Sequence, residues 1–305
     1  MIDTVTILRA RSRRLAKTIN ADGSIADFAR PRTFDLLEVP INGLTELGAL
    51  LSKLERRADC SVVRGAPADA ARTSRVRRLL HPHDGEAPTL RDVPRRWLAL
   101  DCDSLRRPEW VEIDDLLFCA CAVIERLPSH FRRAAFVVQA TAGHGLKPGI
   151  RLRLWCWLSR PTSGRELKYW LRHAPVDRSV FGAAQIIYTA APLFQRGAFD
   201  LLSSRFAIIP GNDAVVVPAS LAPPKPKPRE YDRTQSRADI ESLIRFVESA
   251  QDGERNNALY WAARRAADAH HTDQHTEDLL RAAAVRAGLD EDAAAATISS
   301  GFRHG

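Results

Sequence analysis

Hydrophobic positions near the start of the chain follow two different spacings. From Asn42 onward, leucines recur at intervals of three and four residues, which predicts a helix with one apolar face. These leucines are Leu44, Leu47, Leu51 and Leu54. The short apolar run Cys60–Val63 then predicts a strand, because turn-forming residues follow it. A helix followed by a strand indicates a chain that mixes both kinds of element.

A second strand is predicted by the apolar run Trp97–Leu100, which ends in the acidic sequence Asp101-Cys102-Asp103. Pro108 stands where a helix can begin, and apolar residues at helical spacing follow it. These features predict a strand, an acidic turn and a helix, in that order. The polar, turn-rich segment Ala66–Arg96 before them is predicted to be a long loop.

Further strands and a helix are predicted between residues 134 and 217. Two strands, Ala134–Ala140 and Ile150–Leu158, flank a glycine-rich loop and should pair as a hairpin. Apolar spacing predicts a helix over Ser163–His173. The runs Phe206–Ile209 and Ala214–Val217 predict two closing strands. The mixture of elements predicts an α/β or α+β fold.

A proline-rich, basic segment divides the chain. Residues 218–235 include Pro-Pro-Lys-Pro-Lys-Pro-Arg, which favours an extended linker that cannot pack a core. We therefore predict one domain over residues 1–217 and a second over residues 236–305. Alanine-rich stretches and apolar residues at helical spacing predict that the second domain is a small all-α module.

The most informative feature of the composition is its net charge, which bears on the kind of partner that the protein binds. Lysine and arginine number 45 against 37 acidic residues, so the net charge is +8, which favours a polyanionic partner. The five cysteines form no Cys-x-x-Cys pair, so neither a zinc ribbon nor a disulfide framework is expected. No apolar run reaches the roughly 20 residues of a membrane helix, and no signal peptide is evident. We expect a cytoplasmic protein without membrane contacts.

The acidic pair is the first candidate for chemistry. Asp101 and Asp103 are two residues apart, so on a strand both carboxylates project from the same face. Two carboxylates and a third from elsewhere are what a two-metal phosphoryl-transfer site requires, and oxygen ligands suit Mg²⁺ or Mn²⁺. Two other interpretations stay open. Either the acids simply cap a turn at the end of a strand, or the protein is a glycosyltransferase in which they bind the metal-diphosphate group of a sugar nucleotide.

A basic hairpin follows the acidic pair along the chain. Arg151 and Arg153 alternate with apolar residues and share one strand face, while His144 and Lys147 lie in the loop before them. Arginine forks and a lysine point charge suit the phosphate groups of a nucleoside triphosphate. A solvated hairpin with a charged exterior is the alternative. The tryptophans Trp155 and Trp157 share the parity of the arginines, and we expect them in the core.

Three segments resemble the motifs of archaeo-eukaryotic primases, in particular the primase-polymerases of bacterial phages and mobile elements. Residues 97–103 resemble the first motif, an apolar strand that ends in Asp-x-Asp. Residues 139–158 resemble the second, a strand that contacts the incoming nucleotide. Residues 176–192, which begin Val-Asp177-Arg-Ser, are similar to the third. The resemblance implies a catalytic core with an antiparallel sheet like that of the RNA recognition motif (RRM), followed by a helical module.

The resemblance also implies an activity and a site. The activity is template-dependent nucleotidyl transfer, which makes primers or DNA with two Mg²⁺ or Mn²⁺ ions held by Asp101, Asp103 and Asp177. The expected partners are nucleoside triphosphates, a single-stranded DNA template and a fused or separate helicase. The residues assigned to the nucleotide are His144, Lys147, Arg151, Arg153, Gln185 and Tyr188. Lys17 and Arg64 are weaker candidates for contact with template phosphates.

One departure from the family pattern leaves a second function open. The second motif usually carries Ser-x-His, and a direct overlay puts Arg151 and Arg153 at those positions. Either His144 replaces the histidine or Arg153 itself holds the triphosphate. The alternative function is a replication initiator or single-stranded-DNA-binding protein that keeps the fold without synthesis.

Overall fold

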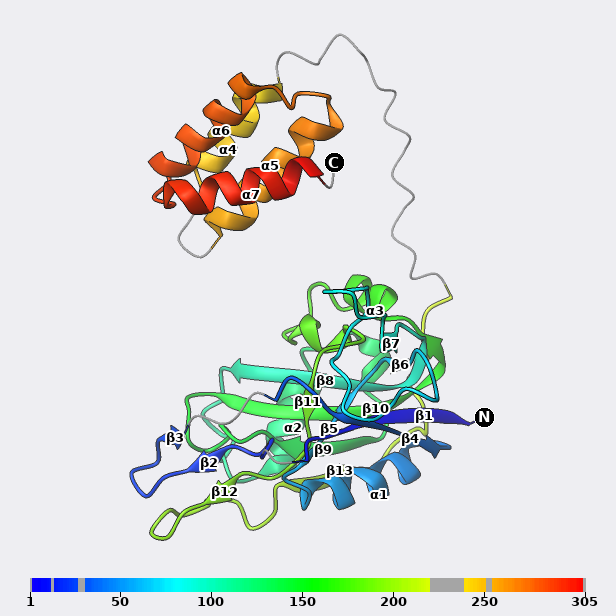
Figure 1. Ribbon diagram of the computed structural model, residues 1–305. Coiled ribbons are helices and arrows are strands. Elements are labelled where there is room, and N and C mark those ends of the chain that lie inside the picture. The colour runs from blue at the N-terminus through cyan, green and yellow to red at the C-terminus, as the bar shows by residue number, and fades with distance from the viewer. Residues whose placement is uncertain (1, 12–13, 27–30, 220–238, 251–253, 304–305) are drawn as a thin grey trace. The chain divides into compact units, whose positions relative to one another are not determined.

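The computed structural model describes residues 2–11, 14–26, 31–219, 239–250 and 254–303. The chain forms two compact units, Met1–Lys225 and Pro226–Gly305, and each is described by itself. The first unit contains antiparallel sheets and helices, and the second contains helices (Figure 1). The predicted mixed α+β class is confirmed. Most of the predicted linker, from residue 220 onward, lies outside the described residues.

The first sheet of unit one has the order β11-β5-β1-β4. Its strands are β1 (Asp3–Arg9), β4 (Asp35–Ile41), β5 (Cys60–Val63) and β11 (Ile187–Tyr188). β1 pairs antiparallel with both β4 and β5, so it is an inner strand, and its central residues are buried. The strand predicted over Cys60–Val63 is confirmed. The sequence patterns assigned neither β1 nor β4.

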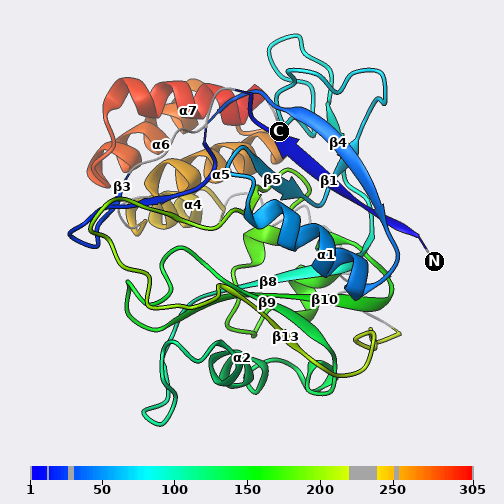
Figure 2. The same cartoon turned by 90° about the horizontal axis from the view of Figure 1, so that it is seen from below.

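The second sheet has the order β13-β9-β10-β8, and every neighbouring pair in it is antiparallel. Its strands are β8 (Arg95–Leu105), β9 (Phe136–Ala140), β10 (Ile150–Thr162) and β13 (Phe206–Ile209). β9 and β10 form the predicted hairpin. Helix α1 (Leu44–Glu55) covers one face of this sheet and α2 (Leu116–Ile124) covers the other (Figure 2).

Apolar side chains of the second sheet and its two helices form the main core. Trp97 and Trp155 are fully buried, with ring centroids 6.0 Å apart. Trp157 is also buried, so the expectation that the strand tryptophans lie in the core is confirmed. Gly48 brings α1 close to the sheet, because a Cβ atom there would lie 3.1 Å from Val137. The sheet that carries the acidic pair is therefore packed on both sides.

Three local predictions differ from the structure. β8 continues through Asp101 and Asp103 to Leu105, so the acids lie in a strand and not in a turn. The helix after them begins at Leu116 and not near Pro108, because the Asp115 carboxylate accepts hydrogen bonds from two backbone N–H groups of its first turn. Residues 214–217 form a single bridge to Leu158 and no strand.

Shorter elements complete the first unit. They are β2 (Thr18–Ile19), β3 (Ile25–Ala26), β6 (Ala66–Pro67), β7 (Leu90–Arg91), β12 (Leu193–Phe194), η1 (Ser129–Phe131), α3 (Gly164–Trp170) and η2 (Arg178–Phe181). The predicted helix after β10 is α3, and Ser163 with Glu166 forms its capping box. The predicted loop over 66–96 contains only β6, β7 and the start of β8 as regular structure.

The second unit consists of four helices in its described residues. They are α4 (Asp239–Glu248), α5 (Arg255–Asp268), α6 (Gln274–Arg286) and α7 (Glu291–Arg303). Small side chains let the helices approach closely: a Cβ atom on Gly301 of α7 would lie 2.6 Å from that of Ala263 on α5. Among the described residues, no helix combines the length and the hydrophobicity that a membrane span requires.

Asp35 gives a test of the first sheet. Its carboxylate accepts from Arg11 Nε at 2.8 Å, Arg9 Nη2 at 3.0 Å and the Arg75 backbone N–H at 3.1 Å. The hydrogen bond from Arg11 is the main cause that holds the pKa of this carboxyl well below its usual range. We expect Asp35→Asn to lower the free energy of unfolding by about 1–3 kcal/mol at pH 7, measured by urea denaturation.

The sign of the pH dependence follows from that pKa. A depressed carboxyl pKa contributes stability above the unfolded value of about 4, and this contribution is lost as the pH falls through the folded value. The difference between Asp35→Asn and the unmodified protein should therefore shrink below about pH 4. The exposed Glu125→Gln is the control. An Asp35→Asn difference that stays constant to pH 2.5 would contradict this role.

Candidate active site

The pairing of β8 with β10 brings each acid of the predicted pair to an arginine. Asp101 lies directly opposite Arg153 in the ladder, and Arg153 Nη2 donates to Asp101 Oδ2 at 2.6 Å. Asp103 lies two residues farther along β8, and its Oδ1 accepts a hydrogen bond from Arg151 Nη1 at 3.4 Å. The parity argument from the sequence is thus confirmed, since both acids and both arginines meet across the strands.

A β-bulge sets the position of Asp103. Leu152 pairs with Cys102, whereas Ile150 pairs with Leu105, so β8 holds one extra residue in this interval. Such bulges bend the strand and re-aim side chains, and they are common next to active sites. Asp103 lies in the bulge and its side chain is 54% exposed, while Asp101 lies in the regular ladder and is buried.

The two acid–arginine pairs differ in burial and in their other contacts. Asp101 and Arg153 are 8% and 7% exposed, and Arg153 Nη1 also donates to the carbonyl oxygen of Tyr188. Within the described residues, Asp101 Oδ1 accepts no hydrogen bond and Arg153 Nε donates none. The pair is therefore firmly placed, yet one carboxylate oxygen in it keeps an unused lone pair.

Asp177 approaches the same region from a distant part of the chain. Its backbone N–H donates to the carbonyl oxygen of Asp101 at 2.8 Å. Its carboxylate caps η2 and accepts from Ser179 N at 2.8 Å and Ser179 Oγ at 2.7 Å. Local hydrogen bonds thus fix the direction of the Asp177 side chain, while the backbone contact fixes its distance from β8.

An open pocket of about 450 Å³ lies where these segments meet. It is lined by Asp103, Leu105, Arg106, Ala174, Pro175, Val176 and Asp177. The structure therefore brings Asp103 and Asp177 to one cavity, with Asp101 next to it in the strand. Arg106 is a pocket residue that the sequence analysis missed. Its position directly after the acidic strand is the signal that could have indicated it.

His144 has a different place from the predicted one. It is fully buried, its Nδ1 accepts from the Arg151 backbone N–H at 3.1 Å, and its Nε2 lies 2.8 Å from the carbonyl oxygen of Ile113. Because Nδ1 accepts, Nε2 carries the proton and donates. Burial is the main cause that lowers the pKa of His144. Both ring nitrogens are used, so His144 supports the loop and is removed from the triphosphate candidates.

The other candidates for nucleotide binding lie at the start of β10 and the loop before it, which hold Arg151 and Lys147, and around β11, where Gln185 and Tyr188 lie. Lys147 is exposed and its side chain, with that of Arg151, passes over Gly143, where a Cβ atom would lie 3.2 Å from Arg151 Cδ. Gln185 is exposed and Tyr188 is half-buried, but neither lines the pocket that contains Asp103 and Asp177. Lys147 and Arg151 do not line it either, but Arg151 reaches Asp103 in the pocket wall.

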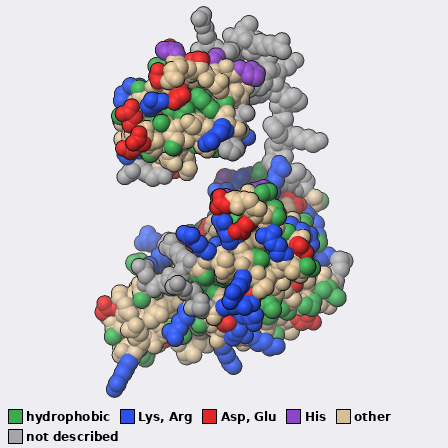
Figure 3. All heavy atoms as spheres, in the orientation of Figure 1, with side chains coloured by type: hydrophobic (Ala, Val, Ile, Leu, Met, Phe, Trp, Pro, Cys, Tyr) green, Lys and Arg blue, Asp and Glu red, His purple; other side chains and the backbone are tan. Residues whose placement is uncertain are grey.

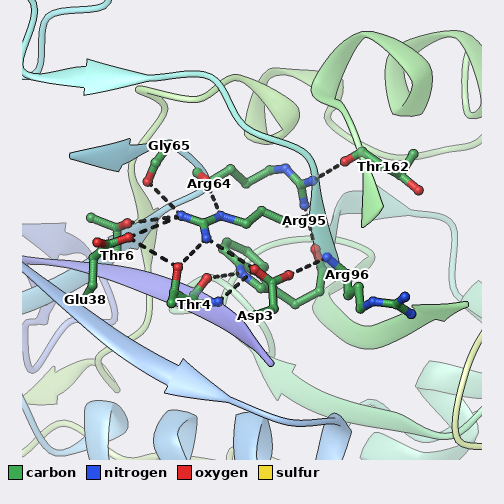
Figure 4. Close-up of polar contacts among 10 residues, drawn as sticks. Asp3, Thr4, Thr6, Glu38, Arg64, Gly65, Arg95, Arg96 and Thr162 are labelled. Carbon is green, nitrogen blue, oxygen red and sulfur yellow. Dashed lines mark hydrogen bonds and ion pairs between the residues drawn. The ribbon is translucent and has the colours of Figure 1, made fainter. Parts of the chain in front are cut away.

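Arg64 belongs to the interior and not to a template-binding surface. It is 1% exposed, and it donates to the carbonyl oxygens of Trp97 at 2.6 Å and Thr162 at 2.9 Å (Figure 4). Burial lowers the pKa of Arg64 to about 10. Arg95 donates to the Arg64 carbonyl oxygen and pairs with Asp3 at 3.2 Å. These contacts join the start of β8 to the first sheet, and they correct the template assignment of Arg64.

Lys17, the other template candidate, precedes β2 and is half-buried. Its carbonyl oxygen accepts from the Leu193 N–H at 2.8 Å, which aligns β2 with β12. A template contact by its side chain stays a prediction.

The donor chemistry of the site fits a hard divalent cation. Carboxylate oxygens are the ligands that Mg²⁺ and Mn²⁺ prefer, and Asp101 Oδ1 is a buried oxygen that has no hydrogen-bond partner in the described part of the chain. As the side chains stand, no three His, Cys, Asp or Glu residues of the described segments form a group that could hold a metal. In this arrangement Arg151 contacts Asp103 and Arg153 contacts Asp101.

A substitution of Arg64 tests its structural role. We expect Arg64→Ala to lower the free energy of unfolding by about 3–5 kcal/mol, because it leaves a cavity and two buried carbonyl groups without donors. The exposed Arg132→Ala should change stability little. Denaturant unfolding of both variants measures this. A stable Arg64→Ala variant with weakened binding to single-stranded DNA would restore the template role.

Comparisons with known proteins give little further information. No family model matches the sequence, and no curated protein matches it. One solved structure, described as the crystal structure of primase RepB′, is similar over 99% of this chain and 93% of that chain. The identity is 10% and the TM-score is 0.30, so the function proposed below rests on the geometry of the site.

Proposed function

We propose that this chain is a template-dependent nucleotidyltransferase of the primase type, which makes primers or DNA. The observation that carries the proposal is the meeting of acids from two separate segments, Asp101 and Asp103 in β8 and Asp177 at the start of η2. Asp103 and Asp177 line one pocket, and the Asp177 N–H is hydrogen-bonded to the backbone of Asp101. Local chain geometry does not require Asp177 to meet β8. A pocket with two carboxylates in its wall, and with Asp101 beside them in the strand, suits metal-assisted phosphoryl transfer.

Each part of the pocket has a task in this proposal. Asp103, Asp177 and the free oxygen of Asp101 would hold Mg²⁺ or Mn²⁺. When bound, the metal would neutralise the triphosphate and activate the attacking 3′-hydroxyl group. Arg106, in the pocket wall, and the neighbouring Lys147 and Arg151 would bind phosphate oxygens.

The substrates fit the charge of the protein. Nucleoside triphosphates and single-stranded DNA are polyanions, and the chain carries a net charge of +8. Lys and Arg side chains are spread over the visible face of the first unit (Figure 3). A template held through its phosphates needs no sequence-specific contacts, and its affinity should fall as salt concentration rises. A template strand with a paired primer end is therefore the substrate to test.

A second candidate function is supported by the arginine pairs. Arg153 and Arg151 neutralise Asp101 and Asp103 without a metal, so the same fold could bind single-stranded DNA as a replication initiator without synthesis. The two functions differ in one respect that an experiment can measure. Both require DNA binding, but only the first requires nucleotide incorporation.

Nucleotide incorporation tests the first function. The protein with primed and unprimed single-stranded DNA, labelled nucleotides and Mn²⁺ should give extended products, and a chelator should abolish them. Asp103→Asn and Asp177→Asn should each lower the rate on the order of 100-fold, because each removes a charged metal ligand. DNA binding should be retained in both variants.

The exposed Asp114→Asn is the matched control and should keep its rate. Salt-sensitive DNA binding by the unmodified protein without any incorporation would favour the second function. Full activity of Asp103→Asn would contradict the assignment of the acids.

A further inference from the structure

We propose that Arg153 is a fixed cation that takes the place of one of the two metal ions, so that the site binds a single divalent ion. This inference rests on the proposed function. The two acid–arginine pairs differ in distance and in burial. The Arg153–Asp101 contact is 2.6 Å and lies in the regular ladder between β10 and β8, whereas the Arg151–Asp103 contact is 3.4 Å and lies at the bulge.

Arg153 has no simple way to leave Asp101. The side chains of both residues are about nine-tenths buried, and the second terminal nitrogen of Arg153 is bound to the Tyr188 carbonyl oxygen. Moving a metal ion between the two side chains would leave a guanidinium buried without its counter-ion, and such a change is strongly unfavourable. A guanidinium also keeps its charge in proteins, so it cannot leave by losing a proton. Arg153 is therefore a permanent part of the site.

Arg151 has the opposite character. The Asp103 side chain is 54% exposed and that of Arg151 is 19% exposed. Arg151 lies over the loop glycine Gly143, where its Nε also donates to the Pro148 carbonyl oxygen at 3.3 Å. Water reaches the Asp103 end of this 3.4 Å contact, so the contact contributes less than the buried Arg153–Asp101 pair and costs less to replace. A metal ion can thus displace Arg151 from Asp103 and leave its guanidinium beside the pocket, available to phosphate oxygens.

The formal charges support one ion. Asp101, Asp103 and Asp177 carry three negative charges, and Arg106, Arg151 and Arg153 carry three positive charges. One divalent ion already gives this group a net charge of +2, and a second would raise it to +4 in a partly buried site. One carboxylate oxygen of Asp101 has no hydrogen-bond partner among the described residues and can serve the single ion with Asp103 and Asp177.

Mn²⁺ titration followed by electron paramagnetic resonance, in the absence of nucleotide, tests the inference. The unmodified protein should bind one Mn²⁺ per chain. Arg153→Gln frees Asp101 and should bind two. Arg153→Lys keeps the positive charge and should bind one, and Arg151→Gln should also bind one, about tenfold more tightly, because a competing cation has been removed. Circular dichroism melting curves establish that each variant is folded.

The outcomes separate the inference from the function beneath it. Two ions bound by the unmodified protein, or one ion bound by a folded Arg153→Gln variant, would overturn the role of Arg153 and leave the proposed enzyme standing. If Arg153→Gln does not fold, two ions bound by Arg153→Lys would overturn it as well. The absence of Mn²⁺ binding in every variant would contradict the metal-dependent function itself.

Discussion

The antiparallel pairing of β8 with β10 determines the rest of the site. Because side chains alternate along both strands, one register places Asp101 against Arg153 and Asp103 beside Arg151. A shift of one residue in either strand would turn its two charged side chains to the opposite face, away from their partners on the other strand. The bulge after Cys102 then makes the two acids unequal, since it leaves Asp101 in the ladder and brings Asp103 into the pocket wall.

The first sheet supports this pairing from a distance. Arg64 and Arg95 bind backbone carbonyl groups and Asp3, and they tie the start of β8 to the strands of the N-terminal sheet. Hydrogen bonds of this kind are buried and have defined directions, so they limit how β8 can slide or rotate. Farther along β8, the Asp177 N–H donates to the carbonyl oxygen of Asp101. Backbone hydrogen bonds thus fix the position of β8 and of the segment that carries Asp177.

The sequence predicted the elements whose signal is local. Helical spacing and alanine-rich stretches indicated α1, α3 and the first three helices of the second unit. Strand parity put Asp101 and Asp103 on one strand face, and Arg151 and Arg153 on another. β1 and β4 were missed because their burial depends on pairing between distant segments, and β4 contains Pro40, which weakens a strand signal. The ladder partner of Asp101 could not be predicted, because register and bulge position are properties of the folded sheet.

Local signals also misled in two cases. A histidine beside a basic strand suggested phosphate binding, but the structure uses both nitrogens of His144 to hold backbone groups. An arginine before a glycine suggested template contact, but Arg64 is buried. In both cases the side chain satisfies backbone groups in the interior, and only the fold shows that these groups need a partner.

The central claim is that acids from β8 and from the segment before η2 form one cation site. Anomalous diffraction from a crystal grown with Mn²⁺ and a non-hydrolysable nucleoside triphosphate tests it most directly. The account predicts an anomalous peak in contact with carboxylate oxygens of both Asp103 and Asp177, with Arg153 still bound to Asp101. A peak that contacts neither acid, or bound nucleotide without a peak at this pocket, would contradict it.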